Sequence, residues 1–229
     1  MYDRTQKVNK AALLFMQNFS EQSIKKDCPH CDAKSFAFKY PLKKTNNFWI
    51  ICDVHPLTEG HILIIPKEHL SCVGEYSNNL LAEFVKLYHQ CSGFLNAEYG
   101  SVATFEHGKI GQTVFHSHVH LFPFRGNESA IVSEGKDKLK HLNSISQLRE
   151  IFMKDGQYLF FSINNKAWVV DISIGVPRFF RDRFAKALGT SERGDWKKMH
   201  QNKKIMTEIN EETQNLKQQW NKHFPSTQF

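Results

Sequence analysis

The chain has 229 residues, which is enough for one large domain or for one domain with a substantial extension. With 41% hydrophobic and 23% charged residues the composition is that of an ordinary globular protein, so neither disulfides nor a metal is needed to hold the whole chain together. The formal net charge of +7 favours anionic partners, but nucleotides, nucleic acids and anionic membrane surfaces all meet that condition.

The five cysteines do not form a disulfide framework, because their number is odd and one close pair, Cys28 and Cys31, stands alone. No apolar run approaches the roughly 18 residues that a membrane span requires. Residues 5–19 contain a short apolar stretch with polar flanks and are expected to form an amphipathic helix rather than a signal peptide. We therefore expect a cytoplasmic protein with no membrane partner.

The first half of the chain is predicted to form two buried strands, a helix and two further strands. The strands cover residues 47–53, 61–65, 101–105 and 113–122. Ser77 is a suitable N-cap for a helix that runs to about residue 97, in which apolar residues recur every three or four positions.

Residues 127–145 are polar and rich in lysine, and they are interpreted as the boundary between a domain of residues 1–126 and an extension of residues 127–229. In the extension, Asn164 and Asn165 predict a tight hairpin between strands at 158–163 and 166–171, because two asparagines tolerate the positive φ that such a turn demands.

The rest of the extension is predicted to be helical. Pro177 is expected to open a helix that ends at Gly189, and the charged tail from Trp196 is expected to form one long, mostly solvated helix. Helices and strands do not alternate as βαβ units would. The predicted fold class is therefore α+β, with a mainly antiparallel sheet, packed helices, and a C-terminal hairpin and helical extension.

The densest chemical signal is the alternation of His116, His118 and His120. On a strand, alternate side chains share one face and lie roughly 7 Å apart. Three interpretations are open: an exposed polar strand face, a mononuclear metal site, or covalent catalysis in which one imidazole attacks phosphorus while its neighbours handle charge and protons. The metal interpretation lacks a carboxylate ligand on the same strand.

The segment from Asn47 to Phe124 resembles the histidine triad (HIT) superfamily of nucleotide hydrolases and transferases. Three motifs carry the resemblance and occur in the family's order: Asp53-Val-His-Pro56, Gly60-His-Ile-Leu-Ile-Ile-Pro-Lys-Glu-His69, and Gln112 to Pro123. The resemblance implies a HIT-like fold. It also implies that His118 is the nucleophile, that His116 and His120 orient it and contact the phosphate, and that His61 is the fourth histidine of the site.

Further residues are expected to bind the nucleotide. By resemblance Asp53 contacts the ribose hydroxyls, although a turn-capping aspartate is the alternative. Ile51 and Val54 would line an apolar slot for the base, or belong to the core. Gln112 and Thr113 are placed to donate hydrogen bonds to the phosphate. Glu106 stands where many family members carry a neutral amide, and it is included as a substrate contact whose role is open.

Cys28-Pro-His-Cys31 is a motif that suits zinc or a thiol redox pair, and the absence of a βαβ pattern around it favours zinc. Some members of the superfamily complete such a site with two histidines, which here correspond to His69 and His116. His30 is an alternative ligand. The resemblance therefore implies a structural Zn²⁺ ion as the cofactor.

The leading function is a hydrolase that cleaves dinucleoside polyphosphates or nucleotide conjugates at the α-phosphate through a nucleotidyl-His118 intermediate. Members of the transferase branch typically have glutamine at the third position of the triad, so His120 favours hydrolysis. The alternatives are a nucleotidyltransferase or phosphorylase, and a nucleic-acid-binding module that includes enzymes of DNA or RNA deadenylation. A homodimer is possible by resemblance, although the extension could block the contact.

Overall fold

The computed structural model describes residues 25–225, so the helix predicted over residues 5–19 lies outside the described part. Within residues 25–225, none of the helices combines the length and the apolar character that crossing a membrane would require.

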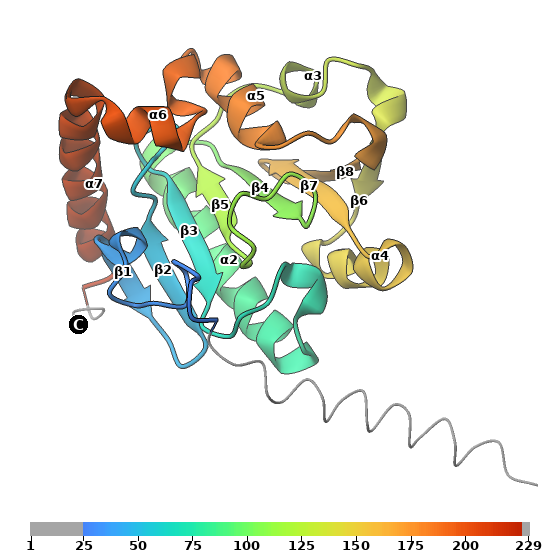
Figure 1. Cartoon of the computed structure of the whole chain (residues 1–229), viewed down its shortest axis with the longest axis horizontal. Coiled ribbons are helices and arrows are strands. Elements are labelled where there is room, and N and C mark those ends of the chain that lie inside the picture. Colours follow the sequence, from blue (N-terminus) through green and yellow to red (C-terminus); the bar gives the residue numbers. More distant parts are fainter. Residues whose placement is uncertain (1–24, 226–229) are drawn as a thin grey trace, which may run out of the picture.

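An eight-stranded sheet forms the centre of the fold, and all its paired strands run antiparallel (Figure 1). Its order is β1-β2-β3-β5-β4-β7-β8-β6. The strands are β1 (Pro41–Lys44), β2 (Phe48–Cys52), β3 (Ile62–Pro66), β4 (Ala103–Gly108), β5 (Val119–Phe122), β6 (Leu139–Leu142), β7 (Tyr158–Ile163) and β8 (Lys166–Val170). The predicted α+β class with a mainly antiparallel sheet is confirmed.

The C-terminal extension continues this sheet. β4 pairs with β5 on one side and, over six residue pairs, with β7 of the extension on the other. The predicted hairpin is present, and Asn164 at its turn has a φ of 53°. Residues 127–145 are more than a boundary, because they contain the short helix α3 (Glu128–Ile131) and strand β6, which pairs with β8.

Helices cover both faces of the sheet (Figure 1). Helix α2 (Asn78–Tyr99) lies on one face, where Phe84, Cys91 and Leu95 join the larger core cluster. Ser77 caps it as predicted, by accepting a hydrogen bond from the Leu80 N–H. Helix α5 (Phe179–Leu188) covers the other face and packs its phenylalanines against β4, β5 and β7. The shorter α4 (Leu148–Asp155) contacts β7, and its Leu148 joins the same core cluster as α2.

Three predicted elements differ from the structure. Residues 113–118 form a loop, and the strand begins only at Val119. The helix expected from Pro177 begins at Phe179. The tail is two helices, α6 (Trp196–Gln201) and α7 (Lys203–His223), because Asn202 ends the first and caps the second.

The tail is mostly exposed, as predicted, but it also contributes to the core. α7 buries one stripe along its length, and the stripe contains Ile205, Ile209, Thr213, Leu216 and Trp220. Leu216 and Trp220 belong to the same core cluster as α2, β1 and β2. Charged residues on the outer face of α7 concealed this apolar stripe in the sequence.

Candidate active site and metal centre

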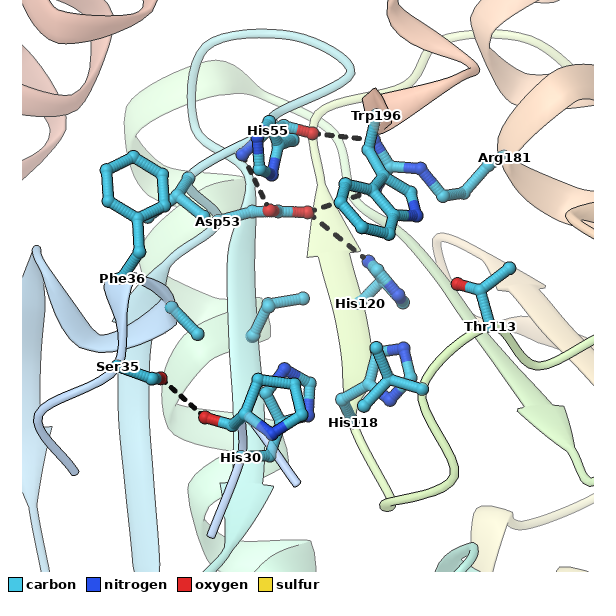
Figure 2. A pocket seen from close by; sticks show the side chains of 15 residues that line it. His30, Ser35, Phe36, Asp53, His55, Thr113, His118, His120, Arg181 and Trp196 are labelled. Carbon is cyan, nitrogen blue, oxygen red and sulfur yellow. Dashed lines mark hydrogen bonds and ion pairs between the residues drawn. The ribbon is translucent and has the colours of Figure 1, made fainter. Parts of the chain in front are cut away.

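A pocket opens where the ends of β2 and β5, the loop before β5 and the C-terminal extension meet (Figure 2). Its walls carry His118 and His120 on one side and apolar groups such as Val54 and Leu63 on another. The extension supplies Arg181 from α5 and Trp196 from α6. The pocket therefore combines imidazole, apolar and charged groups from both parts of the chain.

His118 has a defined tautomer. Its Nδ1 lies 2.6 Å from the carbonyl oxygen of His116. A carbonyl can only accept, so Nδ1 carries the hydrogen and Nε2 keeps the lone pair. Burial lowers the pKa of His118, which favours the neutral ring. A neutral imidazole with a free Nε2 lone pair is the form of histidine that acts as a nucleophile.

His61 and His120 form a hydrogen-bonded pair next to His118. The Leu57 N–H donates to His61 Nδ1 at 3.0 Å, so the hydrogen of the neutral His61 ring is on Nε2. That Nε2 lies 2.9 Å from His120 Nδ1, which must accept. Burial lowers the pKa of His61 to about 3 and that of His120 well below its usual range, so both rings are neutral. Nε2 of His120 is therefore a hydrogen-bond donor.

Asp53 lies next to this pair, at the end of β2. Its Oδ1 accepts the His55 N–H at 2.9 Å, and its Oδ2 lies 3.1 Å from Nη1 of Arg181. Burial raises the pKa of Asp53, but the neighbouring His61, the Arg181 guanidinium and the His55 N–H outweigh burial, so the net pKa is below its ordinary value. The carboxylate is thus an anion at neutral pH, and it lines the pocket.

His116 does not face the pocket with His118 and His120. The expectation of one shared strand face was wrong because residues 113–118 are not a strand. His116 Nε2 donates to the carbonyl of Pro66 at 2.8 Å, so its Nδ1 lone pair is directed elsewhere. It lies 3.5 Å from Sγ of Cys28 and 3.4 Å from Sγ of Cys31.

These residues form a cluster with His69. The Nδ1 atom of His69 is 3.3 Å from Sγ of Cys31 and 3.3 Å from Nδ1 of His116, and the four ligand atoms lie within 4.8 Å of one another. A tetrahedral zinc site with bonds of about 2.0–2.3 Å has edges of about 3.3–3.8 Å. The four residues predicted from the sequence are therefore brought together in a geometry that could hold a metal ion.

His30 is not part of the cluster. It lines the pocket instead, with its ring centroid 5.0 Å from that of His118. Its Nδ1 is buried and has no hydrogen-bond partner among the described residues. In the Cys28-Pro-His-Cys31 turn, the two cysteines thus face the cluster, whereas the histidine between them faces the pocket.

The remaining predicted substrate contacts divide into two groups. Val54 and Thr113 line the pocket. Ile51 lies in a core cluster with Phe38, Leu63 and Ile65 and does not line it. Gln112 donates from Nε2 to the carbonyl of Ser71 at 2.6 Å and also lies outside the pocket.

Glu106 faces away from the pocket, into a buried hydrogen-bond network. Its Oε1 accepts from the Val73 N–H at 3.0 Å and from the Ser117 hydroxyl at 2.8 Å, while Oε2 accepts from Tyr158. Ser117 lies between His116 and His118, so this network fastens the histidine loop from behind. The expectation of a direct substrate contact is not met, because β4 directs this side chain to the α2 face of the sheet.

Sequence reasoning missed Arg181, Trp196 and the role of His107. The Phe180 N–H donates to His107 Nε2 at 3.2 Å, so His107 holds the start of α5. Arg181 is 7% exposed although it lies in a run of charged and aromatic residues that suggests a surface helix. One available signal was its position between Phe180 and Phe184, which both face the core.

Comparison with known proteins identifies the family of the chain. The family model for the HIT domain matches residues 41–127. A HIT-like protein of Chlamydia trachomatis is 35% identical over 79 residues, which are 33% of this chain and 71% of that protein. This chain covers only 54% of Protein hit of Bacillus subtilis and 62% of a HIT-like protein of Mycobacterium tuberculosis.

Two relatives carry enzyme names. Adenosine 5′-monophosphoramidase HNT1 of Saccharomyces cerevisiae is 29% identical over 100 residues, 43% of this chain and 63% of that protein. Adenylylsulfatase HINT3 of Arabidopsis thaliana is 28% identical over 135 residues, 55% of this chain and 68% of that protein. Together with the histidine motif and the extent of the Chlamydia match, these similarities show that the chain belongs to the HIT family.

Proposed function

We propose that the protein is a hydrolase that cleaves nucleotide conjugates or dinucleoside polyphosphates at the α-phosphate, through a nucleotide bound covalently to His118. The observation that carries the proposal is the hydrogen bond from His118 Nδ1 to the His116 carbonyl, which leaves Nε2 as a lone pair in the pocket. The position of His120, with its ring centroid 5.0 Å from that of His118, adds a donor for a phosphoryl oxygen.

In the first step, Nε2 of His118 attacks the α-phosphorus, and the bond from phosphorus to the leaving group breaks with its electron pair on the leaving group. A sulfate or nucleotide phosphate leaves as the anion, whereas an amine takes up a proton from solvent as the bond breaks. The phosphorylated ring carries a positive charge and keeps its Nδ1 hydrogen. The carbonyl of His116 accepts that hydrogen at 2.6 Å, so the charge of the intermediate is stabilised without a further proton transfer.

In the second step, water attacks the same phosphorus and the phosphorus–Nε2 bond breaks, which returns the electron pair to His118. One proton of the water stays on the phosphate and the other passes to solvent, so the neutral enzyme is regenerated. Nε2–H of His120 can donate to the phosphoryl oxygens in both steps, where negative charge is greatest.

The enzyme names of the two relatives support an adenosine 5′-phosphate unit as the part that is transferred. One name describes AMP joined to an amine, and the other describes AMP joined to sulfate. The common unit is consistent with a pocket that has apolar walls at Val54 and Leu63 and a carboxylate at Asp53.

We also propose that Cys28, Cys31, His69 and His116 hold a structural zinc ion. Such an ion would supply fixed tetrahedral coordination and no reacting group. His116 would then be held at Nδ1 by the metal and at Nε2 by the Pro66 carbonyl. Because its carbonyl binds His118, this fixes the backbone next to the nucleophile.

The test is a turnover panel of adenylyl sulfate, adenosine 5′-phosphoramidate and diadenosine polyphosphates in ¹⁸O-labelled water. We expect one or more of these substrates to give AMP that carries ¹⁸O on its phosphate. A rapid burst of leaving group, close to one per enzyme, would precede steady turnover if the intermediate forms faster than it breaks down. Absence of turnover across the panel, or ¹⁸O found in the leaving group, would exclude attack at the α-phosphorus.

A further inference from the structure

The C-terminal extension places one cation in the wall of the active-site pocket. Arg181 lies on α5, and it is the one lysine or arginine among the pocket's described lining residues. It reaches across to Asp53 of the HIT domain, which lies 128 positions earlier in the chain (Figure 2). Both side chains are nearly inaccessible, with relative side-chain exposures of 8% and 7%.

The guanidinium of Arg181 is held from several directions. Its Nη2 donates to the carbonyl of His55 at 2.6 Å and to that of Arg193 at 3.3 Å, and its Nε donates to the carbonyl of Gly194 at 3.4 Å. The planar fork is therefore fixed between the β2–β3 loop and the segment that precedes α6. A lysine has a single ammonium group and cannot reach all these acceptors at once.

Asp53 keeps unused acceptor capacity in this arrangement. The His55 N–H occupies one lone pair of Oδ1, and Arg181 occupies one of Oδ2. A carboxylate has about four acceptor positions, so each oxygen can accept one further hydrogen bond from the pocket. Two vicinal hydroxyl groups of a ribose offer two donors at a matching separation.

A metal ion is the other possible partner of this group, because Asp53, His61 and His120 could also hold one. The Arg181 guanidinium at 3.1 Å already supplies the positive charge. In addition, Nε2 of His61 carries a hydrogen that is directed to His120, so neither of these two nitrogens is free for a metal. The geometry favours recognition of hydroxyl groups.

We infer that Arg181 is a positioning residue through which the C-terminal extension makes the pocket selective for ribonucleotides, by holding Asp53 in place to accept the ribose hydroxyls. This inference rests on the proposed function, since it assumes that a nucleotide occupies the pocket. It assigns the extension a role in substrate selection in addition to its role in the sheet.

The experiment measures binding of AMP, 2′-deoxyAMP and 3′-deoxyAMP by calorimetry, which requires no turnover. The variants are Arg181→Met and Arg181→Lys. Arg183→Met and Arg183→Lys are matched controls, because Arg183 lies on the same helix but bonds to Ile131 and Glu134 outside the pocket. Thermal melting identifies any variant that does not fold, and the lysine variants decide the question if Arg181→Met is unstable.

We expect wild-type protein to bind AMP about 10- to 100-fold more tightly than either deoxynucleotide, as is usual for hydrogen bonds to a charged group. Both Arg181 variants should lose most of this preference by weakening AMP binding, while the Arg183 variants keep it. If folded Arg181 variants keep the preference for AMP, or if wild type shows no preference, this inference is wrong but the proposed function still stands. No AMP binding by wild type would overturn the proposed function as well.

Discussion

Nε2 of His61 lies 2.9 Å from Nδ1 of His120, and the direction of this hydrogen bond is set by a backbone amide. Because the Leu57 N–H donates to the other nitrogen of His61, the His61 hydrogen must be given to His120. The neutral ring of His120 therefore presents an N–H group, and not a basic nitrogen, to the substrate. The sequence left open whether a neighbour of His118 handles charge or protons, and this geometry favours stabilisation of charge.

The distinction predicts different effects for two substitutions of His120. His120→Ala should slow hydrolysis by about 10²-fold, because a donor to the charged phosphoryl group is lost. His120→Gln should lose much less, since an amide can accept from His61 and donate to the phosphate. Single-turnover rates of AMP release measure both effects. Equal losses in the two variants would indicate that His120 acts as an acid or base.

His118→Asn should reduce turnover by at least about 10⁴-fold, because the reacting lone pair is removed while a hydrogen bond to the His116 carbonyl can be kept. Substrate labelled at the α-phosphate should leave acid-labile, base-stable label on the wild-type protein and none on the variant. His141→Asn is the control, since His141 is an exposed histidine on β6 and its loss should change neither result. Label retained by His118→Asn would contradict the assignment of the nucleophile.

Metal analysis of purified protein should give close to one zinc per chain. Cys28→Ser combined with Cys31→Ser should lose the metal and melt at a lower temperature, because metal binding is coupled to folding. Cys91→Ala serves as a control: Cys91 is buried in α2, and its replacement affects packing but should not affect zinc content. A metal-free wild-type protein of full stability and activity would refute the site.

The raised pKa of Glu106 predicts that the stability of the protein depends on pH. Burial raises its pKa from 4.5 to about 7, although hydrogen bonds from Tyr158, Ser117 and Val73 partly oppose the shift. Between these two pH values the folded state binds more protons than the unfolded state. The stabilising contribution is therefore complete below pH 4.5 and lost as the pH rises through 7.

The size of this effect is about 3 kcal/mol for a shift of this extent. The free energy of unfolding of wild type, relative to that of Glu106→Gln, should fall by this order between pH 4 and pH 8. Urea denaturation at a series of pH values measures both free energies of unfolding. Subtracting one from the other removes the contribution of the buried histidines, because both proteins contain them. A pH-independent difference between wild type and Glu106→Gln would mean that the carboxyl of Glu106 titrates normally.

Much of the fold could be predicted from local patterns. Continuous apolar runs identified β2 and β3 as buried strands, Ser77 identified the start of α2, and two asparagines identified the β7–β8 turn. Each of these signals acts within a few residues. The four residues of the metal cluster could be named because the family resemblance joined a cysteine motif to two distant histidines.

The rest depended on tertiary contacts. Side chains alternate only where the backbone is extended, and the strand does not begin until Val119, so His116 could turn to the cysteines. Arg181 is buried because α5 packs against β4, β5 and β7 and its arginine reaches Asp53 just after β2, and no local pattern reports that placement. The sequence did not show which face of the sheet Glu106 occupies, because this depends on the pairing of β4 with β5 and β7.

The ion pair between Asp53 and Arg181 also affects the synthesis of the protein. The two residues are separated by 128 positions, which a ribosome covers in about 10 s at typical elongation rates. During that interval the nascent chain contains Asp53 but not Arg181, so this cation is not there to balance the carboxylate. The three histidines of the motif are also synthesised before Arg181. Asp53 therefore cannot be buried as a paired anion until α5 has left the ribosome. The pocket is therefore among the last parts of the molecule to be completed, although its aspartate and its histidines are made before α5.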